Sequence, residues 1–422
     1  MDDPIYPNAS DSDVPRPAIS RRTILAGSAA AGTAATAGCL GDGGTDNEET
    51  EPGQAFVDRA TVYVFNTGDG TVSVIDSETD SVVGTRSIGM TSSFPSNQFT
   101  PQLIEEPSDS LWLNVDDGVR AVEVGTFEQQ RHVETGSGAN WQEQTPDGEY
   151  VVVSAREPAH RQLRLDASHD SETFGEVTAE LDRLTEGGRG DNDGPGPCDV
   201  TIHPDGEYAY VPDLFGDTLT VIDIEAFEIV RQIDVENDDG SAVEPWMGTA
   251  SWDGSTLLVE NNGGDGGSES LWDVSDPADP VEMARITPAD GLGRGPLTSE
   301  IGPDSEYGYV FTRETADVTV IDLATGEVDD RLALGGRAFV GSWNVARSKL
   351  YVPVQTNDEV AVIDSERREI VDRLDVGAEP YGATAAPVRS ERNDETQASI
   401  EQIASEYETT YCLGQCACGH EL

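Results

Sequence analysis

Three cysteines and one histidine lie within nine residues at the C-terminal end of the sequence. Thiolate and imidazole groups are ligands that copper(I) and zinc(II) accept in tetrahedral sites. Cys412, Cys416, Cys418 and His420 are therefore a candidate copper or zinc site. A disulfide between two of these thiols, as expected outside the cell, and a reactive tail without structure remain as alternatives.

Three arginines stand next to glycine residues, in a chain that has 25 Lys and Arg against 81 Asp and Glu. Flanking glycines let the backbone bend and leave a guanidinium accessible, and its fork fits a carboxylate or a phosphate. We expect Arg189, Arg294 and Arg337 to converge on one rim and to bind an anionic small molecule or an acidic protein partner. The alternative is that each arginine neutralises a neighbouring Asp or Glu.

Known catalytic motifs are absent from the sequence. It contains no GxSxG, no HExxH and no phosphate-binding GxxxxGK loop. Its five histidines are too scattered for a multi-histidine copper cluster, and His203, in a Pro-Asp-Gly turn, is predicted to be solvated. The sequence thus predicts binding rather than catalysis, and it offers no catalytic residue.

The net charge of −56 is extreme, and Lys349 is the single lysine. A chain this acidic is not expected to bind nucleic acid or an anionic membrane surface through its overall charge. Aromatic and β-branched residues recur in strand patterns, which argues against disorder. The acidic residues therefore indicate a solvated surface in concentrated salt, where self-repulsion is screened, as in a halophilic organism.

The N-terminal region resembles an export signal. Arg21 and Arg22 precede a short, weakly apolar run, as in twin-arginine signals, and the small residues before Cys39 resemble a lipobox. We expect residues 1–38 to be the signal, Cys39 to be lipidated at the outer face of the cytoplasmic membrane, and residues 39–56 to form an acidic flexible tether. An ordinary surface arginine pair and a chance cysteine are the alternative.

A short pattern recurs along the chain. Val-x-Val-Ile-Asp or a close variant occupies residues 72–76, 219–223, 318–322 and 360–364, with weaker copies at 120–124, 162–166 and 270–274. Each copy belongs to a unit of about 40–50 residues with about four short alternating runs, which is typical of a β-propeller blade. We predict an all-β fold over residues 57–388, a seven-bladed propeller of four-stranded antiparallel blades. Residues 168–196 are predicted to be an insertion, and residues 389–422 a polar tail with a short helix.

The ends of the repeat predict how the ring closes. The array begins near residue 57 with a second-type strand, and an unpaired first-type strand follows the seventh unit at 380–387. An open array would leave sheet edges exposed, which closure removes. We therefore predict that residues 380–387 form the innermost strand of the blade that contains residues 60–88.

These motifs resemble a known family. Tyr63-Val64-Phe65-Asn66, the Val-Ile-Asp strands and the Pro-Asp-Gly turns are similar to the YVTN, or YncE-like, propellers of archaeal and bacterial cell surfaces. With the export signal, the chain resembles a twin-arginine lipoprotein of haloarchaeal type. The resemblance implies a cell-surface binding module, expected to be monomeric. It also leaves open a metal-handling or electron-transfer accessory protein and a lactonase-like hydrolase, because this scaffold carries all these functions.

Propeller ligands usually bind where the loops before the innermost strands converge. Trp141, Trp246, Tyr381 and Asp199 are therefore candidate binding residues beside the three arginines, and Glu143 and Glu300 are the other carboxylates nearest this mouth. The aromatic residues either line a pocket for a planar or apolar ligand or fill the narrow end of the channel. The positions at which the innermost strands are predicted to begin are Phe99, Trp141, Cys198, Trp246, Leu297, Phe339 and Tyr381.

Overall fold

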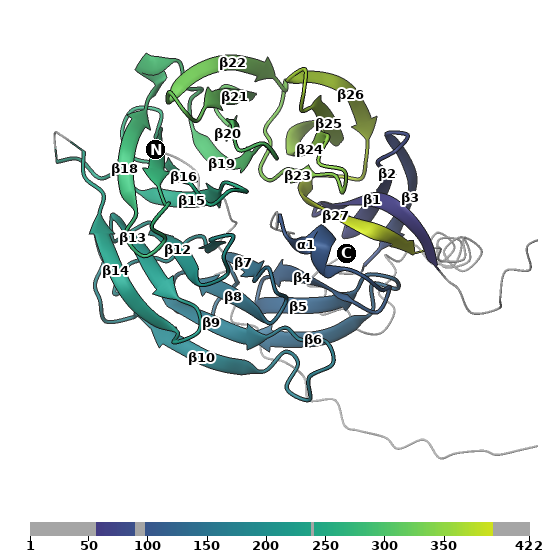
Figure 1. Ribbon diagram of the computed structural model, residues 1–422, viewed down its shortest axis with the longest axis horizontal. Coiled ribbons are helices and arrows are strands. Elements are labelled where there is room, and N and C mark those ends of the chain that lie inside the picture. Colours follow the sequence, from purple (N-terminus) through teal and green to yellow (C-terminus); the bar gives the residue numbers. More distant parts are fainter. Residues whose placement is uncertain (1–55, 89–97, 238–239, 391–422) are drawn as a thin grey trace, which may run out of the picture. The chain divides into compact units, whose positions relative to one another are not determined.

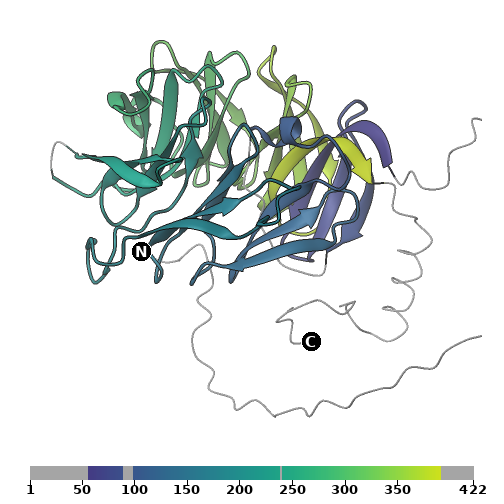
Figure 2. The ribbon, with the colours of Figure 1, turned by 60° about the horizontal axis from the view of Figure 1, so that its bottom comes forward.

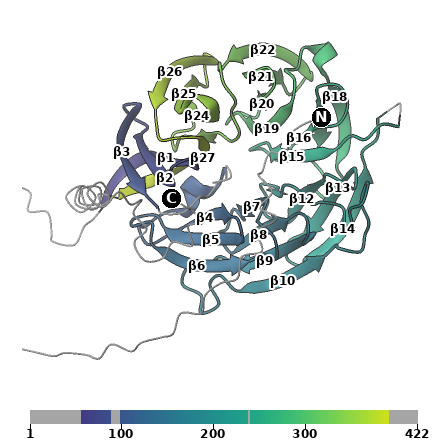
Figure 3. The same ribbon diagram turned by 180° about the vertical axis from the view of Figure 1, so that it is seen from behind.

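The computed structural model describes residues 56–88, 98–237 and 240–390, which form seven antiparallel sheets arranged in a ring (Figures 1 and 3). The sheets follow one another around the ring in chain order, and the chain end closes the first sheet. The fold is the predicted seven-bladed β-propeller. We number the sheets as blades 1 to 7 in the order in which the chain enters them.

Each blade is an antiparallel meander, and its strands are numbered along the chain. Blade 1 contains β27 (Pro380–Ser390), β1 (Phe56–Asn66), β2 (Thr71–Asp76) and β3 (Ser81–Ser87); blade 2 contains β4 (Ser110–Val115), β5 (Gly118–Glu123) and β6 (Gln129–Glu134). Blade 3 contains β7 (Trp141–Gln144), β8 (Tyr150–Ala155), β9 (Arg161–Asp166) and β10 (Val177–Asp182); blade 4 contains β11 (Thr201–Ile202), β12 (Tyr208–Asp213), β13 (Thr218–Asp223) and β14 (Glu228–Asp234). Blade 5 contains β15 (Pro245–Ala250), β16 (Thr256–Asn261), β17 (Ser268–Asp273) and β18 (Val281–Ile286). Blade 6 contains β19 (Pro296–Ile301), β20 (Tyr307–Thr312), β21 (Asp317–Asp322) and β22 (Glu327–Ala333), and blade 7 contains β23 (Ser342–Trp343), β24 (Lys349–Val354), β25 (Glu359–Asp364) and β26 (Glu369–Asp375).

The turn between the first two strands of blade 4 shows why this sequence bends there. Gly206 has a φ of 77°, a left-handed conformation that glycine adopts without a steric penalty. The Asp205 carboxylate accepts a hydrogen bond from the Glu207 backbone N–H at 2.8 Å, which satisfies a group that the turn removes from the ladder. Asp147 does the same for the Glu149 N–H in blade 3, at 3.0 Å.

Burial decreases from the middle of each blade to its outer edge. In blade 4, almost every side chain of β12 is buried, whereas the outermost strand β14 is mostly exposed. Apolar side chains of neighbouring blades pack together, as Phe311 and Val320 of blade 6 do with Leu350 and Ile363 of blade 7. Since a single sheet is apolar on both faces, each blade requires a neighbour on either side.

Strand β27 closes the ring, as the sequence predicts. It pairs antiparallel with β1, with Val62 opposite Ala385 and Val64 opposite Ala383, and it lies beside the first strands of the chain in Figure 2. The Tyr63 hydroxyl donates a hydrogen bond to the Val388 carbonyl at 2.9 Å. Blade 1 is therefore built from segments more than 300 residues apart.

Blade 2 departs from the prediction. Its sheet has three strands within the described residues, and the residues after Phe99 form a short helix, α1 (Thr100–Leu103), in place of the predicted innermost strand. Pro101 explains the difference, because proline lacks the N–H that a sheet ladder needs and fits the first turn of a helix. The Gln142 side chain of blade 3 covers part of the vacant edge by donating to the Trp112 carbonyl at 2.7 Å. No helix of the described residues has the length and apolar character needed to cross a membrane.

The predicted insertion at 168–196 is partly wrong, because it contains β10, the outermost strand of blade 3. The strand does alternate, with apolar Val177, Ala179 and Leu181 between polar residues, but it is short and mostly exposed and lies in an acidic, glycine-rich segment. The segment after it is anchored by Arg183, which is buried and forms an ion pair with Asp213 of β12 at 2.8 Å.

Removal of β27 should destroy the fold. We expect a chain that ends at residue 390 to unfold like the full chain, and a chain that ends at residue 379 to lose more than about 6 kcal/mol, because several fully buried side chains of β27 and the ladder to β1 disappear. Thermal unfolding followed by circular dichroism measures the difference. Equal melting temperatures for the two chains would contradict the closure.

Candidate functional site

The predicted mouth residues meet on one face of the ring, which we call the front face. It carries the loops before the innermost strands and the turns between second and third strands. Six of the seven predicted positions, all except Phe99, belong to one buried cluster. The ring centroids of Phe339 and Tyr381 are 4.3 Å apart, and those of Trp141 and Phe339 are 6.3 Å apart. These side chains pack on one another at this end of the channel, and we call them the aromatic plug: Trp141, Cys198, Trp246, Leu297, Phe339 and Tyr381.

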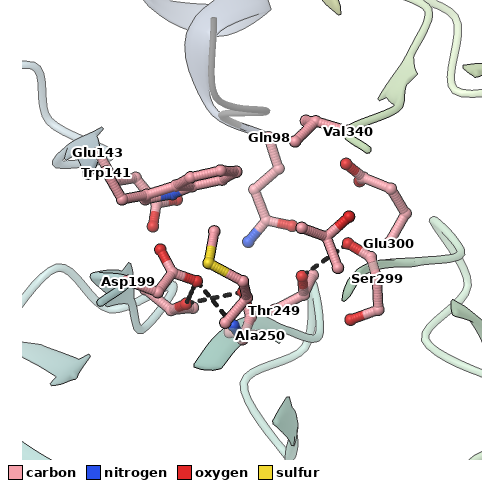
Figure 4. A pocket seen from close by; sticks show the side chains of 13 residues that line it. Gln98, Trp141, Glu143, Asp199, Thr249, Ala250, Ser299, Glu300 and Val340 are labelled. Carbon is pink, nitrogen blue, oxygen red and sulfur yellow. Dashed lines mark hydrogen bonds between the residues drawn. The ribbon is translucent and has the colours of Figure 1, made fainter. Parts of the chain in front are cut away.

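A cavity of about 30 Å³ lies beside the plug, at the centre of the ring (Figure 4). Its wall consists mainly of the innermost strands of blades 3 to 6, and the Gln98 side chain reaches it from the segment before α1. This volume is the space open to the centre of a water molecule, of which one buried water needs about 10–15 Å³, so the cavity holds about two waters. Polar side chains predominate in its wall: Gln98, Glu143, Asp199, Thr201, Thr249, Thr298, Ser299 and Glu300.

At one level of the innermost strands, six blades carry a polar residue, and four of these residues line the cavity. The second strand of each blade has six residues that pair with the third strand. In six blades, the innermost-strand residue opposite the third of these six carries a hydroxyl or a carboxyl group, as Thr201 does opposite Tyr210 and Glu300 opposite Tyr309. These residues could have been found in the sequence by aligning the innermost strand of each blade with its second strand, because the pairing register between the two is the same in these six blades. The level consists of Glu143, Thr201, Thr249, Glu300, Ser342 and Thr384.

Two of the predicted carboxylates connect neighbouring blades. Asp199 accepts a hydrogen bond from the Val200 N–H and another from the Gly248 N–H of β15, both at 2.6 Å. Glu143 of β7 accepts one from the Ile202 N–H of β11 at 2.7 Å. Each carboxylate therefore ties the innermost strand of one blade to that of the next.

Burial raises the pKa of both groups. The pKa of Glu143 lies well above its usual value, first because the side chain is buried and then because Asp199 and Glu300 are close; the Ile202 N–H acts in the opposite direction. Burial also raises the pKa of Asp199 well above the usual range, against the hydrogen bonds from Gly248 and Val200. The structure thus brings Glu143, Asp199 and Glu300 together, and the first two of these acids resist ionisation.

This centre is not arranged for catalysis on a substrate of sugar size, because the cavity is too small. The histidines are engaged elsewhere: His160 Nδ1 accepts the Gly196 N–H at 3.1 Å, and His203 Nε2 lies 3.0 Å from the Gly254 carbonyl. His203 is buried, so its predicted exposure is wrong; it packs against the turn of blade 5. Among the described residues, no three His, Cys, Asp or Glu side chains are placed to hold a metal ion.

The three predicted arginines all lie in front-face loops, but two of them are neutralised. Arg189 forms ion pairs with Asp217 at 2.7 Å and Glu244 at 3.0 Å. Arg294 pairs with Asp265 at 2.7 Å and more distantly with Glu314. For Arg189 and Arg294, the alternative interpretation of the sequence therefore holds: each neutralises neighbouring acidic side chains.

Arg337 has a different neighbour, Arg313, which the sequence did not indicate because it lies in the turn between β20 and β21 without flanking glycines. The Arg313 side chain is partly buried and donates to the Asn262 side-chain oxygen at 3.4 Å. Burial lowers the pKa of Arg313, Glu314 raises it, and the nearby charge of Arg337 lowers it further. Within the described part of the chain, neither guanidinium forms an ion pair with a carboxylate.

The remaining predicted residues lie outside the described residues. Arg21, Arg22 and Cys39 of the export and lipidation signals, and Cys412, Cys416, Cys418 and His420 of the copper or zinc site, therefore stay predictions. Cys198 is described, and burial raises the pKa of its thiol to about 12, so it is not a reactive thiolate.

Comparison with known proteins supports the fold. No protein-family model and no curated protein matches the sequence. A solved protein from Lactobacillus plantarum has a TM-score of 0.62 at 13% identity, over 78% of this chain and 99% of that chain. The periplasmic gluconolactonase PpgL of Pseudomonas aeruginosa has a TM-score of 0.59 at 16% identity, over 77% and 98%. A functionally unknown protein from Desulfotomaculum acetoxidans has 0.59 at 13%, over 78% and 99%. At these identities the similarity extends to the fold alone.

Loss of the Asp199 carboxylate should weaken the junction between blades 4 and 5. Asp199→Ala leaves the partly buried Gly248 N–H and the Val200 N–H without their acceptor, so we expect a loss of about 2–3 kcal/mol in the free energy of unfolding. Asp199→Asn keeps one acceptor oxygen and should lose less. Denaturant unfolding of both variants measures this order, and an alanine variant as stable as the parent would refute the role.

Proposed function

We propose that the chain is an exported binding propeller whose front face takes a carboxylate- or phosphate-bearing ligand between Arg313 and Arg337. One observation carries the proposal: the charges of two arginines act on each other, and neither is paired with a carboxylate of the described residues. The chain has a net charge of −56, so carboxylates are abundant. Glu314 also acts on Arg313, but its carboxylate lies 3.4 Å from the Arg294 guanidinium and forms no ion pair with Arg313.

Charge supports an anion at this position. Like charges repel each other, and the repulsion grows as burial lowers the local dielectric constant. Arg313 is partly buried, so its charge is screened less than that of a fully exposed arginine. An anion between the two groups offsets the repulsion, and guanidinium groups bind carboxylate and phosphate through paired hydrogen bonds.

The surroundings are suited to recognition. The Arg313 N–H donates to the Gly295 carbonyl at 2.9 Å, and the Gln355 N–H donates to the Arg337 carbonyl at 2.8 Å, so backbone bonds hold both loops in place. Elsewhere on the front face, the Arg156 guanidinium lies 5.2 Å from the Trp246 ring centroid, over the aromatic plug. Arg156 is paired with Glu157 at 2.5 Å, so it does not add a free charge to the Arg313–Arg337 site.

The cellular setting follows from the sequence. The twin arginines, the lipobox cysteine and the YVTN-like motifs support a lipid-anchored protein on the outer face of the cytoplasmic membrane of a halophilic cell. There the front face meets either a free anionic metabolite or an acidic segment of a partner protein. The similarity to the gluconolactonase does not carry its activity over, because that similarity is confined to the fold.

Neutralising either arginine should weaken anion binding. We expect inorganic phosphate and succinate, titrated calorimetrically at fixed potassium chloride, to bind at least about tenfold more weakly to Arg313→Gln and to Arg337→Gln, because each loses a charge-assisted hydrogen bond. Arg231→Gln is the matched control, since Arg231 is exposed on β14 and paired with Asp279. Unchanged affinity in both rim variants, or an equal loss in the control, would contradict the proposed site.

A further inference from the structure

Two glutamates face each other inside blade 5. Glu260 of β16 stands directly opposite Glu269 of β17 in the antiparallel register. Both residues are fully buried, and no oxygen of either carboxyl group forms a hydrogen bond with another described residue. Side chains directly opposite in such a pair have Cβ atoms about 5 Å apart, so the carboxyl groups lie within reach of each other.

The pair faces blade 6. Residues two apart on a strand share a face, so Glu260 lies on the face of Leu258, and Glu269 on the face of Leu271. Both leucines pack with Ile301 and Leu323 of blade 6 in one buried cluster. The two acids therefore sit in the apolar interface between two blades.

The corresponding positions are apolar in blades 4, 6 and 7, whereas blades 2 and 3 have uncharged polar residues there, Asn114 in the former and Ser154 with Gln162 in the latter. The fifth residue of the second strand and the second residue of the third strand are Pro212 and Leu219 in blade 4, Phe311 and Val318 in blade 6, and Pro353 and Val360 in blade 7. The fold therefore tolerates apolar side chains here, and blade 5 alone among these four carries acids.

Among the described residues, no positive charge compensates the two acids. Ser299 of β19 lies close enough to Glu260 to oppose the effect of burial on its pKa, but its hydroxyl is outside hydrogen-bonding geometry. The charged side chains of the surrounding strands do not pair with Glu260 or Glu269. Glu300 lines the central cavity, Asp317 pairs with Arg331, and Glu282 of β18 pairs with Arg285. Arg313, which follows β20, donates a hydrogen bond to the Asn262 side chain. Asp199 of blade 4 is a nearby acid, and the charge of Glu260 contributes to its raised pKa.

Two buried carboxylates without counter-charge are too costly to persist in ionised form. We infer that Glu260 and Glu269 share a proton, forming a carboxylic acid–carboxylate pair that closes the interface between blades 5 and 6 and opens it when the proton is lost. The protonated group donates its O–H to the other carboxylate, which satisfies one oxygen of each. This is the arrangement by which two adjacent acids titrate as one unit.

The direction of the pH effect follows from burial. Burial raises the pKa of Glu260 to about 7 and that of Glu269 well above its usual value, the latter also through the neighbouring Glu260. The unfolded chain ionises these groups near pH 4.5, so above that pH the folded chain holds more protons than the unfolded chain. The stability that the pair contributes is therefore complete below pH 4.5 and is lost as the pH rises through 7 and above.

Thermal unfolding between pH 5 and pH 9 at fixed salt tests the pair. We expect about 4 °C of the fall in the melting temperature of the parent over this range to come from these groups, and the fall to shrink by that amount in Glu260→Phe/Glu269→Val, which copies the apolar residues of blade 6; Glu143 and Asp199, whose pKa values burial also raises, account for a fall that remains. The control is Glu228→Gln, because Glu228 is exposed on β14 and its variant removes a surface charge alone. A double variant that retains the fall of the parent would overturn the inference.

Infrared spectroscopy at pH 7 provides a readout that does not depend on stability. Surface carboxylates are ionised at this pH, so the C=O stretch of a protonated carboxyl group reports buried acids. We expect this band to weaken in the near-isosteric double variant Glu260→Gln/Glu269→Gln, because a single substitution leaves the proton on the other buried acid, and to persist in part because Glu143 and Asp199 are also buried. An unchanged band in the double variant would show that the pair carries no proton.

Discussion

The burial of both faces of every blade is the constraint on which the rest of this structure depends. The middle strands are apolar on both sides, so a blade is stable between two neighbours and unstable alone. An open array would leave two terminal blades with an exposed apolar face. The chain solves this by returning at its end to pair β27 with β1, so that no terminal blade exists. Every functional position on the front face depends on this ring, because seven separate loops supply it.

Closure also determines what the centre of the ring contains. The innermost strands converge, so the space between them suits small side chains such as Ala383 and Ala385, and small polar ones such as Thr201 and Thr249. Glu143 and Asp199 are tolerated there because their carboxylates accept backbone N–H groups of the next blade, which the short ladder of the innermost strands leaves unpaired. The buried acids of the channel are thus structural ties between blades.

Acidic residues serve different purposes inside and outside this molecule. At the surface they pair with scarce arginines such as Arg189 and Arg294, or remain solvated. Inside, at Glu260 and Glu269, they lack any cation, and protonation is the remaining way to lower their cost. The Arg313–Arg337 pair differs from these arginines because each of its guanidinium groups has the like charge of the other nearby and no ion pair among the described residues.

The sequence by itself determined the fold, the number of blades and the closing strand, because strand alternation, Asp-Gly turns and the Val-Ile-Asp repeat are local patterns. It missed β10, whose short apolar alternation lies in an acidic, glycine-rich segment, and it placed a strand at Phe99 where a short helix with Pro101 in its first turn begins. The candidate site was only partly predictable. Gly-Arg motifs located front-face loops, but which arginine finds a carboxylate depends on turns from other strands and other blades. Likewise, Glu260 lies opposite Glu269 because of the register between β16 and β17. No cation of the described residues pairs with them, because apolar side chains of blade 6 pack against this part of blade 5. Tertiary structure decided these points, because charge compensation depends on distances between residues that lie far apart in the chain.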